Sequence, residues 1–136
     1  MEPLTDYVLD TMALVKHLED ALPPAANRAF RDAEGGGGRL FLPEIALAEF
    51  AYVARRGWLR VDNPRAVLEE VVDQIRAADY LALSSLPAPA WDIFLDLRIP
   101  ELHDRMIASD ALHRRLPLIT NDRSMKAIEG LRTLWR

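Results

Sequence analysis

The sequence predicts an α/β fold in which a parallel β-sheet is covered by helices on both faces. Short apolar runs alternate with longer segments of helical periodicity, the connections between them are short, and prolines or glycines stand at most of the boundaries. Strands and helices that alternate in this way form βαβ units, whose crossover helices cover the sheet. No internal repeat or long linker divides the 136 residues, so we expect a single domain over residues 1–136.

In the amino-terminal half, prolines and glycines mark where the expected helices begin and end. Pro23 and Pro24 stop the first helix, and Pro43 opens the third at the first-turn position that proline tolerates. The glycine run 35–38 lacks the lysine and hydroxyl of a phosphate-binding loop, so we interpret it as a flexible connection. The expected elements are a strand at 7–9, helices at 11–22 and 25–33, a strand at 39–42 and a helix at 43–56.

The carboxy-terminal half repeats this alternation. Asn63 and Pro64 are typical of a helix cap and first turn, and Pro100 separates two later helices. The expected elements are a helix at 66–78, a strand at 80–84, a helix through Trp91 and Phe94, a helix at 103–115, a strand at 118–120, a helix at 123–129 and a fifth strand at 133–135.

The composition excludes several classes of protein. The chain has no cysteine, which excludes disulfides and thiolate metal sites and favours a reducing, cytoplasmic location. Residues 1–7 carry no basic segment, and no apolar run approaches the ~20 residues of a membrane helix, so we expect neither a signal peptide nor a membrane span. The net charge of −4 argues against a sequence-tolerant nucleic-acid binder, although metal ions at acidic positions would reverse the local sign.

Two aspartates stand where the carboxyl ends of parallel strands gather. Asp10 ends the first expected strand, and Asp122 closely follows the fourth. Ligands of open α/β sheets bind at this edge of the sheet. Each aspartate also precedes a helix, so a helix N-cap is the alternative interpretation of both.

Two further acids, Glu49 and Asp104, lie on helix faces that are predicted to be buried. Apolar residues stand three and four positions on either side of Glu49, and three, four, seven and eight positions after Asp104. A buried carboxylate is costly unless it is paired or bound to a cation. Ordinary ion pairs with Arg105 or Lys126, or a cap role for Asp104, are the structural alternatives.

Four converging carboxylates repel one another unless a cation neutralises them. All-oxygen ligand sets suit the hard cations Mg²⁺ and Mn²⁺ rather than zinc. Mg²⁺ usually binds through one or two carboxylates together with substrate phosphates, and a metal-activated water can hydrolyse a phosphodiester. The four acids are therefore candidates for a metal-dependent phosphodiesterase site.

The same residues resemble the motifs of the PIN domain family. The likeness covers nearly the whole chain, from Val8 to Trp135, and in length the chain is most similar to VapC-type ribonuclease toxins of toxin–antitoxin pairs. Each motif is short, but the ordered set of four on the expected elements is fairly specific. The motifs are Asp10-Thr11 after a strand, Glu49 at the end of segment 42–49, segment 103–108 and segment 118–122.

The resemblance implies a three-layer α/β/α sandwich with a five-stranded parallel sheet, and an endoribonuclease that needs Mg²⁺ or Mn²⁺. It also implies an RNA substrate, a homodimer and neutralisation by a small antitoxin protein. Hydroxyls that the family often places near the metal site fall on Thr11 and Thr120, and Asn121 could orient water. The family's acidic tetrad, both catalytic and metal-binding, falls on Asp10, Glu49, Asp104 and Asp122.

Two positions depart from the family pattern. Met12 stands where a small polar residue is frequent, and Asp110 stands where a small or hydroxyl residue is usual. Asp110 is six residues past Asp104, about 240° around a helix, so we expect it to point away from the site as a solvated or interface acid. We interpret His103 as a residue of the helix cap region.

Two alternatives use the same residues differently. A phosphoaspartyl phosphatase or a receiver-like domain also places an aspartate at a strand end. However, the phosphatase pattern requires a second aspartate where Met12 stands, and the receiver pattern requires a lysine where Asn121 stands. A non-catalytic PIN-like interaction module would retain the acids only as caps and ion pairs.

Overall fold

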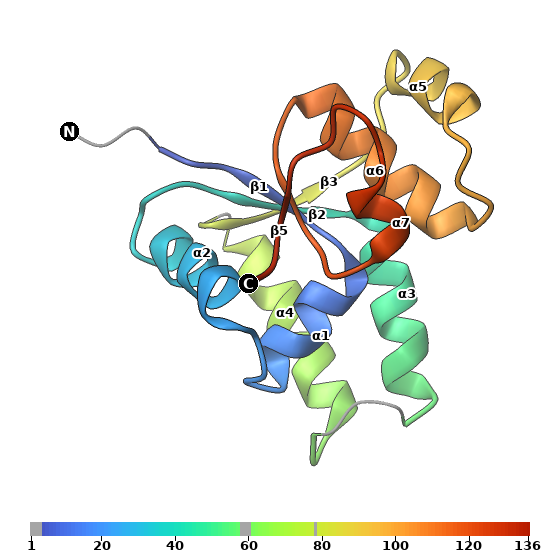
Figure 1. The fold of residues 1–136 in the computed structure, drawn as a ribbon. Helices are drawn as coiled ribbons and strands as arrows, with labels where there is room; N and C mark the ends of the chain where they lie inside the picture. The colour runs from blue at the N-terminus through green and yellow to red at the C-terminus, as the bar shows by residue number, and fades with distance from the viewer. Residues whose placement is uncertain (1–3, 58–60, 78) are drawn as a thin grey trace.

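The computed structural model describes residues 4–57, 61–77 and 79–136, in which five parallel strands and seven helices follow one another along the chain (Figure 1). The predicted α/β class and the three-layer α/β/α arrangement are confirmed. The elements are β1 (Tyr7–Leu9), α1 (Thr11–Leu18), α2 (Pro24–Glu34), β2 (Leu40–Pro43), α3 (Glu44–Arg55), α4 (Pro64–Arg76), β3 (Leu81–Ser84), α5 (Ala90–Asp96), α6 (Leu102–Arg114), β4 (Leu118–Ile119), α7 (Arg123–Lys126) and β5 (Thr133–Leu134).

Two helices end earlier than the sequence predicts. α1 stops at Leu18 because Asp20 adopts the left-handed conformation (φ 55°), which a right-handed helix cannot continue. α7 stops at Lys126, and the chain turns until Gly130, which also has a positive φ (83°). The apolar periodicity of both segments runs past these turns and therefore overestimates the helix lengths. The predicted end of α4 at residue 78 lies outside the described residues.

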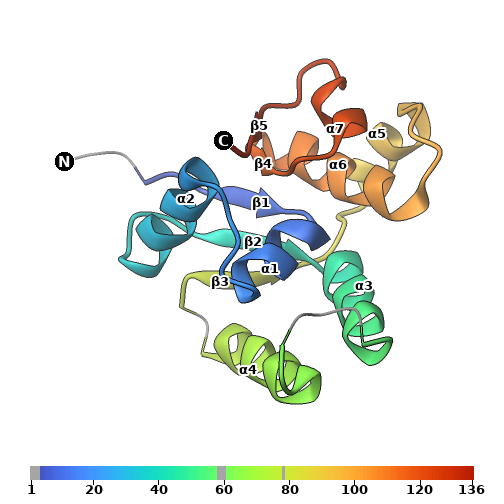
Figure 2. The same ribbon diagram turned by 60° about the horizontal axis from the view of Figure 1, so that its bottom comes forward.

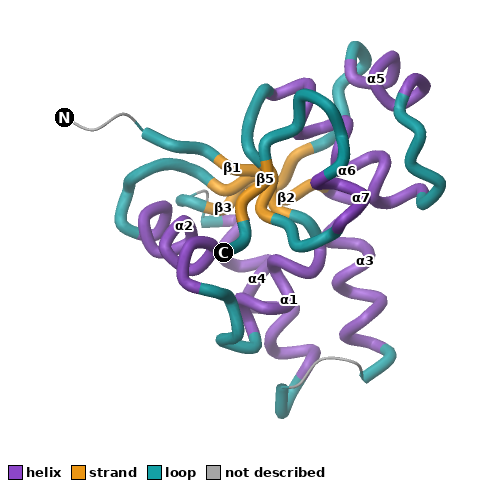
Figure 3. Tube along the Cα trace, viewed as in Figure 1, coloured by secondary structure: helices purple, strands orange, loops and turns teal. Residues whose placement is uncertain are grey.

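The helices lie in two layers (Figures 1 and 2). α1 to α4 connect β1, β2 and β3 and cover one face of the sheet, whereas α5, α6 and α7 connect β3, β4 and β5 over the other face. This division follows from right-handed crossovers, because the chain moves outward from β1 to β3 and then returns past β1 to β4 and β5. Figure 3 shows the strands between the two helical layers.

The order in which strands are added to the sheet reverses at β1, which pairs with β2 on one side and with β4 on the other. The connections that leave β1 and β4 run to opposite faces of the sheet. In open α/β sheets such a switch point leaves a crevice at the carboxyl ends of the two strands. The residues that directly follow β1 and β4 therefore lie at the place where a binding site is expected.

The core is built from apolar side chains of the strands and of the helices on both faces. Leu9, Leu40 and Ile119 are fully buried on the central strands, and Phe30 of α2 and Phe50 of α3 pack against them in one cluster. Such continuously apolar strands are typical of a parallel sheet that is buried on both faces. Within the described ranges, no helix is long and apolar enough to cross a membrane.

The glycine run before β2 forms a defined turn, which is more specific than the flexible connection that we predicted. A Cβ atom on Gly38 would lie 1.8 Å from the carbonyl oxygen of Thr5, and the φ of this glycine is 152°. Only glycine lets the two backbones approach so closely. The backbone N–H of Thr5 donates to the carbonyl of Gly37 (3.0 Å), which aligns the segments that lead into β1 and β2.

Candidate active site

Four segments that are distant in the sequence bring the predicted tetrad to the carboxyl edge of the sheet. Asp10 follows β1, and Asp122 follows β4, the strand that pairs with β1. Glu49 comes from α3, and Asp104 comes from the first turn of α6, which packs against α3 and β1. All four acids line one cavity of about 400 Å³. The other residues that line it are Thr11, Met12, Lys16, Val53, Asn121 and Trp135.

Asp10 is both a helix cap and a wall of the cavity. It is buried, and its Oδ1 accepts a hydrogen bond from the backbone N–H of Ala13 (2.7 Å) as the N-cap of α1. Burial is the main reason that the pKa of Asp10 is raised to about 6, while hydrogen bonds from Thr120 and Ala13 oppose this change. The carboxylates of Asp122 and Glu49 raise the pKa further. The cap and site interpretations are compatible, because the cap bond to Ala13 uses one of the two carboxylate oxygens.

Asp122 is held in place by the start of its own helix. Its Oδ1 accepts hydrogen bonds from the backbone N–H (2.8 Å) and the hydroxyl (2.6 Å) of Ser124, as the N-cap of α7. The bond from the Ser124 hydroxyl is the main reason that the pKa of Asp122 is lowered, although partial burial acts in the opposite direction. The backbone N–H of Asp122 donates to Oγ1 of Thr120 (3.1 Å). Thr120 therefore contacts both strand-end aspartates.

Asp104 is the tetrad acid whose pKa is raised most. It is not the cap of α6, because the side chain of Glu101 takes that place and accepts a hydrogen bond from the backbone N–H of Asp104 (2.7 Å). Burial, followed by the charges of the four surrounding carboxylates, raises the pKa of Asp104 to about 7. The side chains of Asp104 and Asp122 are hydrogen-bonded to each other. The raised pKa of Asp104 and the lowered pKa of Asp122 place the proton of this contact on Asp104.

Glu49 lies at the edge of a buried helix face rather than within it. The buried face of α3 is formed by Ala46, Phe50 and Ala54, whereas the side chain of Glu49 is 31% exposed. The prediction of a buried position was wrong because it counted Tyr52 as an interior residue, and Tyr52 is 53% exposed. The position of Glu49 at this edge brings its carboxylate to the cavity.

The carboxylate of Glu49 has a contact on each oxygen. Oε1 accepts a hydrogen bond from the hydroxyl of Thr11, one of the predicted supporting residues. Oε2 lies 3.5 Å from Nδ1 of His103, and that nitrogen is also 2.6 Å from Oε1 of Glu101. His103 thus links the cap of α6 to Glu49, a contact that its predicted cap-region role did not include.

Ordinary ion pairs do not account for the four acids. In the part of the chain that the structure describes, no salt bridge joins a lysine or an arginine to any of them. The Nε of Arg105 donates to the carbonyl oxygen of Ile99 (2.9 Å), and Nζ of Lys126 donates to Oδ1 of Asn121 (3.1 Å). Among the same residues, no three acidic or histidine side chains are arranged as a ready-made metal cluster. The cavity is therefore acidic, with Lys16 as its one lysine among the described lining residues.

The sequence as a whole matches a known domain family. The match is to the PIN domain and covers residues 7–131. The chain belongs to the PIN domain family. This membership favours the PIN interpretation of the acids over the phosphoaspartyl phosphatase and receiver-like alternatives. No curated protein sequence matched.

Solved structures share the fold of this PIN domain at low sequence identity. One is VapBC2 from Rickettsia felis bound to a DNA fragment from their promoter, with a TM-score of 0.73, 20% identity and coverage of 97% of this chain and 100% of the other. DNA-bound VapBC from Salmonella typhimurium gives a TM-score of 0.72 and 22% identity over 96% and 98% of the two chains. A toxin–antitoxin complex from Klebsiella pneumoniae gives a TM-score of 0.63 and 16% identity over 92% of this chain and 94% of the other. These likenesses establish the fold.

Asp110, which departs from the PIN pattern, is buried rather than solvated. Its side chain is 2% exposed, its Oδ2 accepts a hydrogen bond from the hydroxyl of Ser84 (2.8 Å), and its Oδ1 accepts one from Nε of Arg114 (2.9 Å). Asp110 lines a different, small cavity, which agrees with its expected direction away from the tetrad. The solvated interpretation was wrong because Arg114, one helical turn later, and Ser84 on β3 satisfy the carboxylate inside the fold.

Four described residues of the cavity were not predicted as site residues: Met12, Lys16, Val53 and Trp135. Lys16 stands one helical turn after Met12, and Val53 stands one turn after Glu49, so helical spacing would have placed both on the cavity side. Trp135 follows β5 at the other end of the chain. No local spacing could have revealed Trp135, because only the pairing of β5 with β4 brings it to this edge of the sheet.

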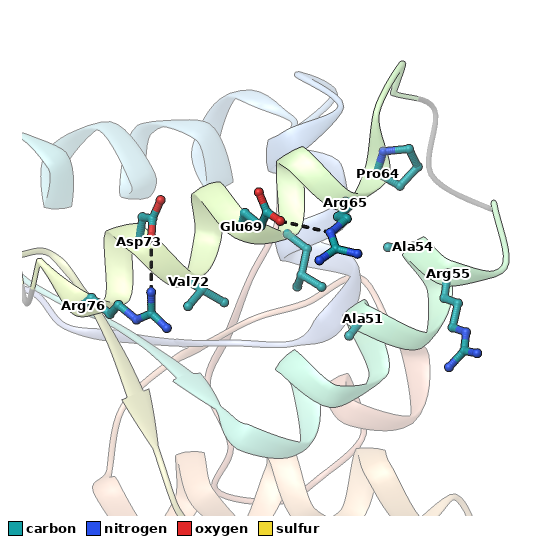
Figure 4. Close-up of a pocket in the computed structure, with 10 residues that line it drawn as sticks. Ala51, Ala54, Arg55, Pro64, Arg65, Glu69, Val72, Asp73 and Arg76 are labelled. Carbon is teal, nitrogen blue, oxygen red and sulfur yellow. Dashed lines mark hydrogen bonds and ion pairs between the residues drawn. The ribbon is translucent and has the colours of Figure 1, made fainter.

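A larger cavity, of about 690 Å³, lies between α3 and α4, away from the tetrad (Figure 4). The charged side chains that α4 contributes to it are paired with one another: Nε of Arg65 is 3.1 Å from Oε1 of Glu69, and Nη1 of Arg76 is 3.6 Å from Oδ1 of Asp73. Both described acids of this cavity, Glu69 and Asp73, come from one helix and have arginine partners, so they do not form a converging cluster like the tetrad. We therefore place the candidate active site at the smaller, acidic cavity.

Proposed function

We propose that this PIN domain is a metal-dependent endoribonuclease and the toxin component of a type II toxin–antitoxin pair. One observation supports the activity above all others. Four carboxylates from separate parts of the chain line one cavity, and the pKa values of two of them are raised to about 6 and about 7. Acids with perturbed pKa values that gather in a cleft are typical of functional sites.

The donor set fits Mg²⁺ or Mn²⁺ better than softer metals, because the acids present only oxygen and the chain has no cysteine. Mg²⁺ usually retains several waters and binds through one or two carboxylates and the substrate phosphate, so a closed protein cage is not required. A bound cation of this kind activates water and stabilises the charge that develops on a phosphate. We assign Asp10 and Asp104, when ionised, to hold the cation, with Asp122 beside them.

We assign Glu49 to the attacking water. The hydroxyl of Thr11 donates to Oε1 of Glu49, so we assign Oε2, the oxygen nearer to His103, to orient a water or accept its proton. His103 lies 3.5 Å from Oε2 and restrains the same carboxylate. Hydrolysis of the phosphodiester by this water would leave a 5′-phosphate.

The structural relatives support the proposed partners. Two of them are VapBC complexes on DNA, and a third is a toxin–antitoxin complex. We therefore propose a small antitoxin protein as the partner of this chain and RNA as its substrate. A homodimer and a cytoplasmic location complete the proposal, the latter in keeping with a chain that has no cysteine.

Cleavage of a mixed RNA pool tests the proposal. The purified protein is incubated with the pool in Mg²⁺, in Mn²⁺ and in EDTA, beside the variants Asp10→Asn and Asp92→Asn. Asp92 is the matched control, because it is an exposed aspartate in the first turn of α5. We expect cleavage that requires the divalent cation, falls by about 100-fold or more in Asp10→Asn and is unchanged in Asp92→Asn.

Two outcomes would contradict the proposal. Cleavage that is equal in EDTA, or that Asp10→Asn leaves intact, would remove the tetrad from the reaction. A folded protein that neither cleaves RNA nor gains thermal stability from Mg²⁺ or Mn²⁺ would favour a non-catalytic interaction module, because a ligand that binds the folded state must stabilise it.

A further inference from the structure

The cavity at the tetrad is lined by two chemically different sets of residues. The acids, Thr11 and Asn121 are polar and account for the proposed metal chemistry. Met12, Val53 and Trp135 are apolar or aromatic, and cation binding makes no use of them. A ligand that fills this cavity beside a bound cation would therefore meet an apolar surface as well as the cation.

Met12 stands in the first turn of α1, directly after the capping residue Asp10 and the hydroxyl of Thr11. Its side chain is 49% exposed, although its neighbours Ala13 and Leu14 are buried. One exposed methionine on a surface needs no explanation. A methionine that lines the same cavity as a tryptophan does, since thioether and aromatic side chains both make favourable contacts with flat rings.

Trp135 is positioned by the backbone on which it stands. It follows β5, and its carbonyl oxygen accepts a hydrogen bond from the backbone N–H of Ala26 on α2 (3.1 Å). The side chain is half-buried against the core and also lines the cavity. An indole fixed in this way loses little conformational freedom when a planar ring stacks on it.

Lys16 adds a positive charge to the cavity beside Met12. It lies four residues after Met12, so both side chains are on one face of α1, and both line the cavity. Its Nζ is 3.4 Å from Oε1 of Glu19, and its side chain remains 38% exposed. The ammonium group is therefore accessible to an anionic ligand beside the methionine.

We infer that Met12 and Trp135 bind the base of a nucleotide next to the scissile phosphate, and that Lys16 contacts the neighbouring phosphate. This inference rests on the proposed function and specifies its substrate. The cavity, at about 400 Å³, is in the size range of sites that enclose small ligands. A base can stack on a tryptophan only after it leaves its own stack, so the bound strand is unpaired where it is cut.

Binding of two matched single strands tests the inference without relying on cleavage. The probes are fluorescein-labelled oligouridylate of about eight nucleotides and an abasic ribose-phosphate strand of the same length. Fluorescence anisotropy in Ca²⁺ gives the affinity of each strand for the full chain. The proteins are the wild type, Trp135→Ala, Trp135→Phe and Met12→Ala, with Trp91→Ala as the matched control.

Trp91 is a suitable control because it is also a partly exposed tryptophan (41%), but it lies on α5 with its ring against Phe94 (5.0 Å between centroids). We expect the wild type to prefer oligouridylate over the abasic strand. Trp135→Ala should lower the affinity for oligouridylate by about tenfold, and Met12→Ala by less, while abasic binding stays constant. Trp135→Phe and Trp91→Ala should keep the preference.

Equal affinity of the wild type for both strands, or equal losses in Trp91→Ala and Trp135→Ala, would overturn the inference. Trp135→Phe retains an aromatic ring and Met12 is exposed, so these two variants test the inference even if Trp135→Ala does not fold. The thermal shift in Mn²⁺ separates this inference from the proposed function. If Mn²⁺ raises the melting temperature but the wild type shows no preference for oligouridylate, only the base-binding inference is contradicted. If the wild type prefers oligouridylate but Mn²⁺ does not change the melting temperature, only the metal-dependent nuclease is contradicted.

Discussion

Asp10 and Asp104 occupy positions where the ionised carboxylate is less stable than it is in water. Burial removes water from both groups, and the other carboxylates of the cavity add repulsion. Asp122 differs because hydrogen bonds from Ser124 stabilise its ionised form and lower its pKa. The site therefore combines two acids that lose their protons at a higher pH than usual with one that loses its proton at a lower pH, and Asp104 is hydrogen-bonded to Asp122.

This arrangement predicts how Asp104→Asn changes the stability of the metal-free protein. The pKa of Asp104 is raised from 3.8 to about 7, so the protonated group stabilises the fold at low pH, and this contribution is lost as the pH rises through about 7. Asparagine never ionises and can still donate a hydrogen bond to Asp122. In EDTA at about pH 8 we expect the variant to melt a few degrees above the wild type, with no difference near pH 4.

Thermal unfolding monitored by circular dichroism across this pH range measures the effect. The exposed Asp92→Asn provides the baseline for removing one negative charge from the surface. A variant that melts below the wild type at every pH would show that Asp104 stabilises the fold through its contacts, and would contradict the role of repulsion.

At the scale of the elements, prolines and caps were sufficient to predict where most helices begin. α3 starts directly after Pro43 and α4 starts at Pro64, and the side chain of Asn63 caps α4 as predicted. Helix ends were harder to predict, because the left-handed conformation of Asp20 that ends α1 has no counterpart in the apolar pattern. The face of α3 was also misjudged, since periodicity does not distinguish the edge of a buried stripe, where Glu49 lies, from its centre.

The cap of α6 connects helix stability to the site. Oε2 of Glu101 accepts a hydrogen bond from the backbone N–H of Asp104, and Oε1 of Glu101 lies 2.6 Å from Nδ1 of His103. Glu101→Ala should cost about 1 kcal/mol of stability through the lost cap, and should also weaken cleavage because Asp104 and His103 lose their orientation. Urea unfolding and RNA cleavage rates measure the two effects.

Asn63→Ala is the matched variant for this test. It removes the cap of α4, where Oδ1 of Asn63 accepts the backbone N–H of Ala66 (3.1 Å), and α4 does not contribute to the described lining of the acidic cavity. A similar loss of stability with unchanged cleavage is expected. If both variants reduced cleavage in proportion to their stability, the cap of α6 would have no specific role at the site.

At the scale of the whole molecule, the order of the strands explains what the sequence could and could not predict. Parallel strands place all their carboxyl ends at one edge, so the meeting of Asp10 and Asp122 followed from the α/β pattern alone. The position of Trp135 depends on β5 pairing beside β4, a long-range choice that local sequence does not encode. Asp110 was misjudged for the same reason, because its partner Ser84 comes from β3 across the sheet.

The stability of the whole molecule should couple metal binding to pH. A cation that binds at the tetrad displaces the protons of Asp10 and Asp104, whose pKa values are about 6 and about 7, so its apparent affinity should rise on the order of a hundredfold between about pH 5.5 and about pH 8. The melting temperature in Mn²⁺, compared with that in EDTA at each pH, reports this change because a ligand stabilises the folded state that it binds. We expect a small shift near pH 5.5, a larger one near pH 8, and a much reduced shift in Asp10→Asn at both. A shift that does not depend on pH, or that Asp10→Asn leaves unchanged, would place the cation elsewhere on the molecule.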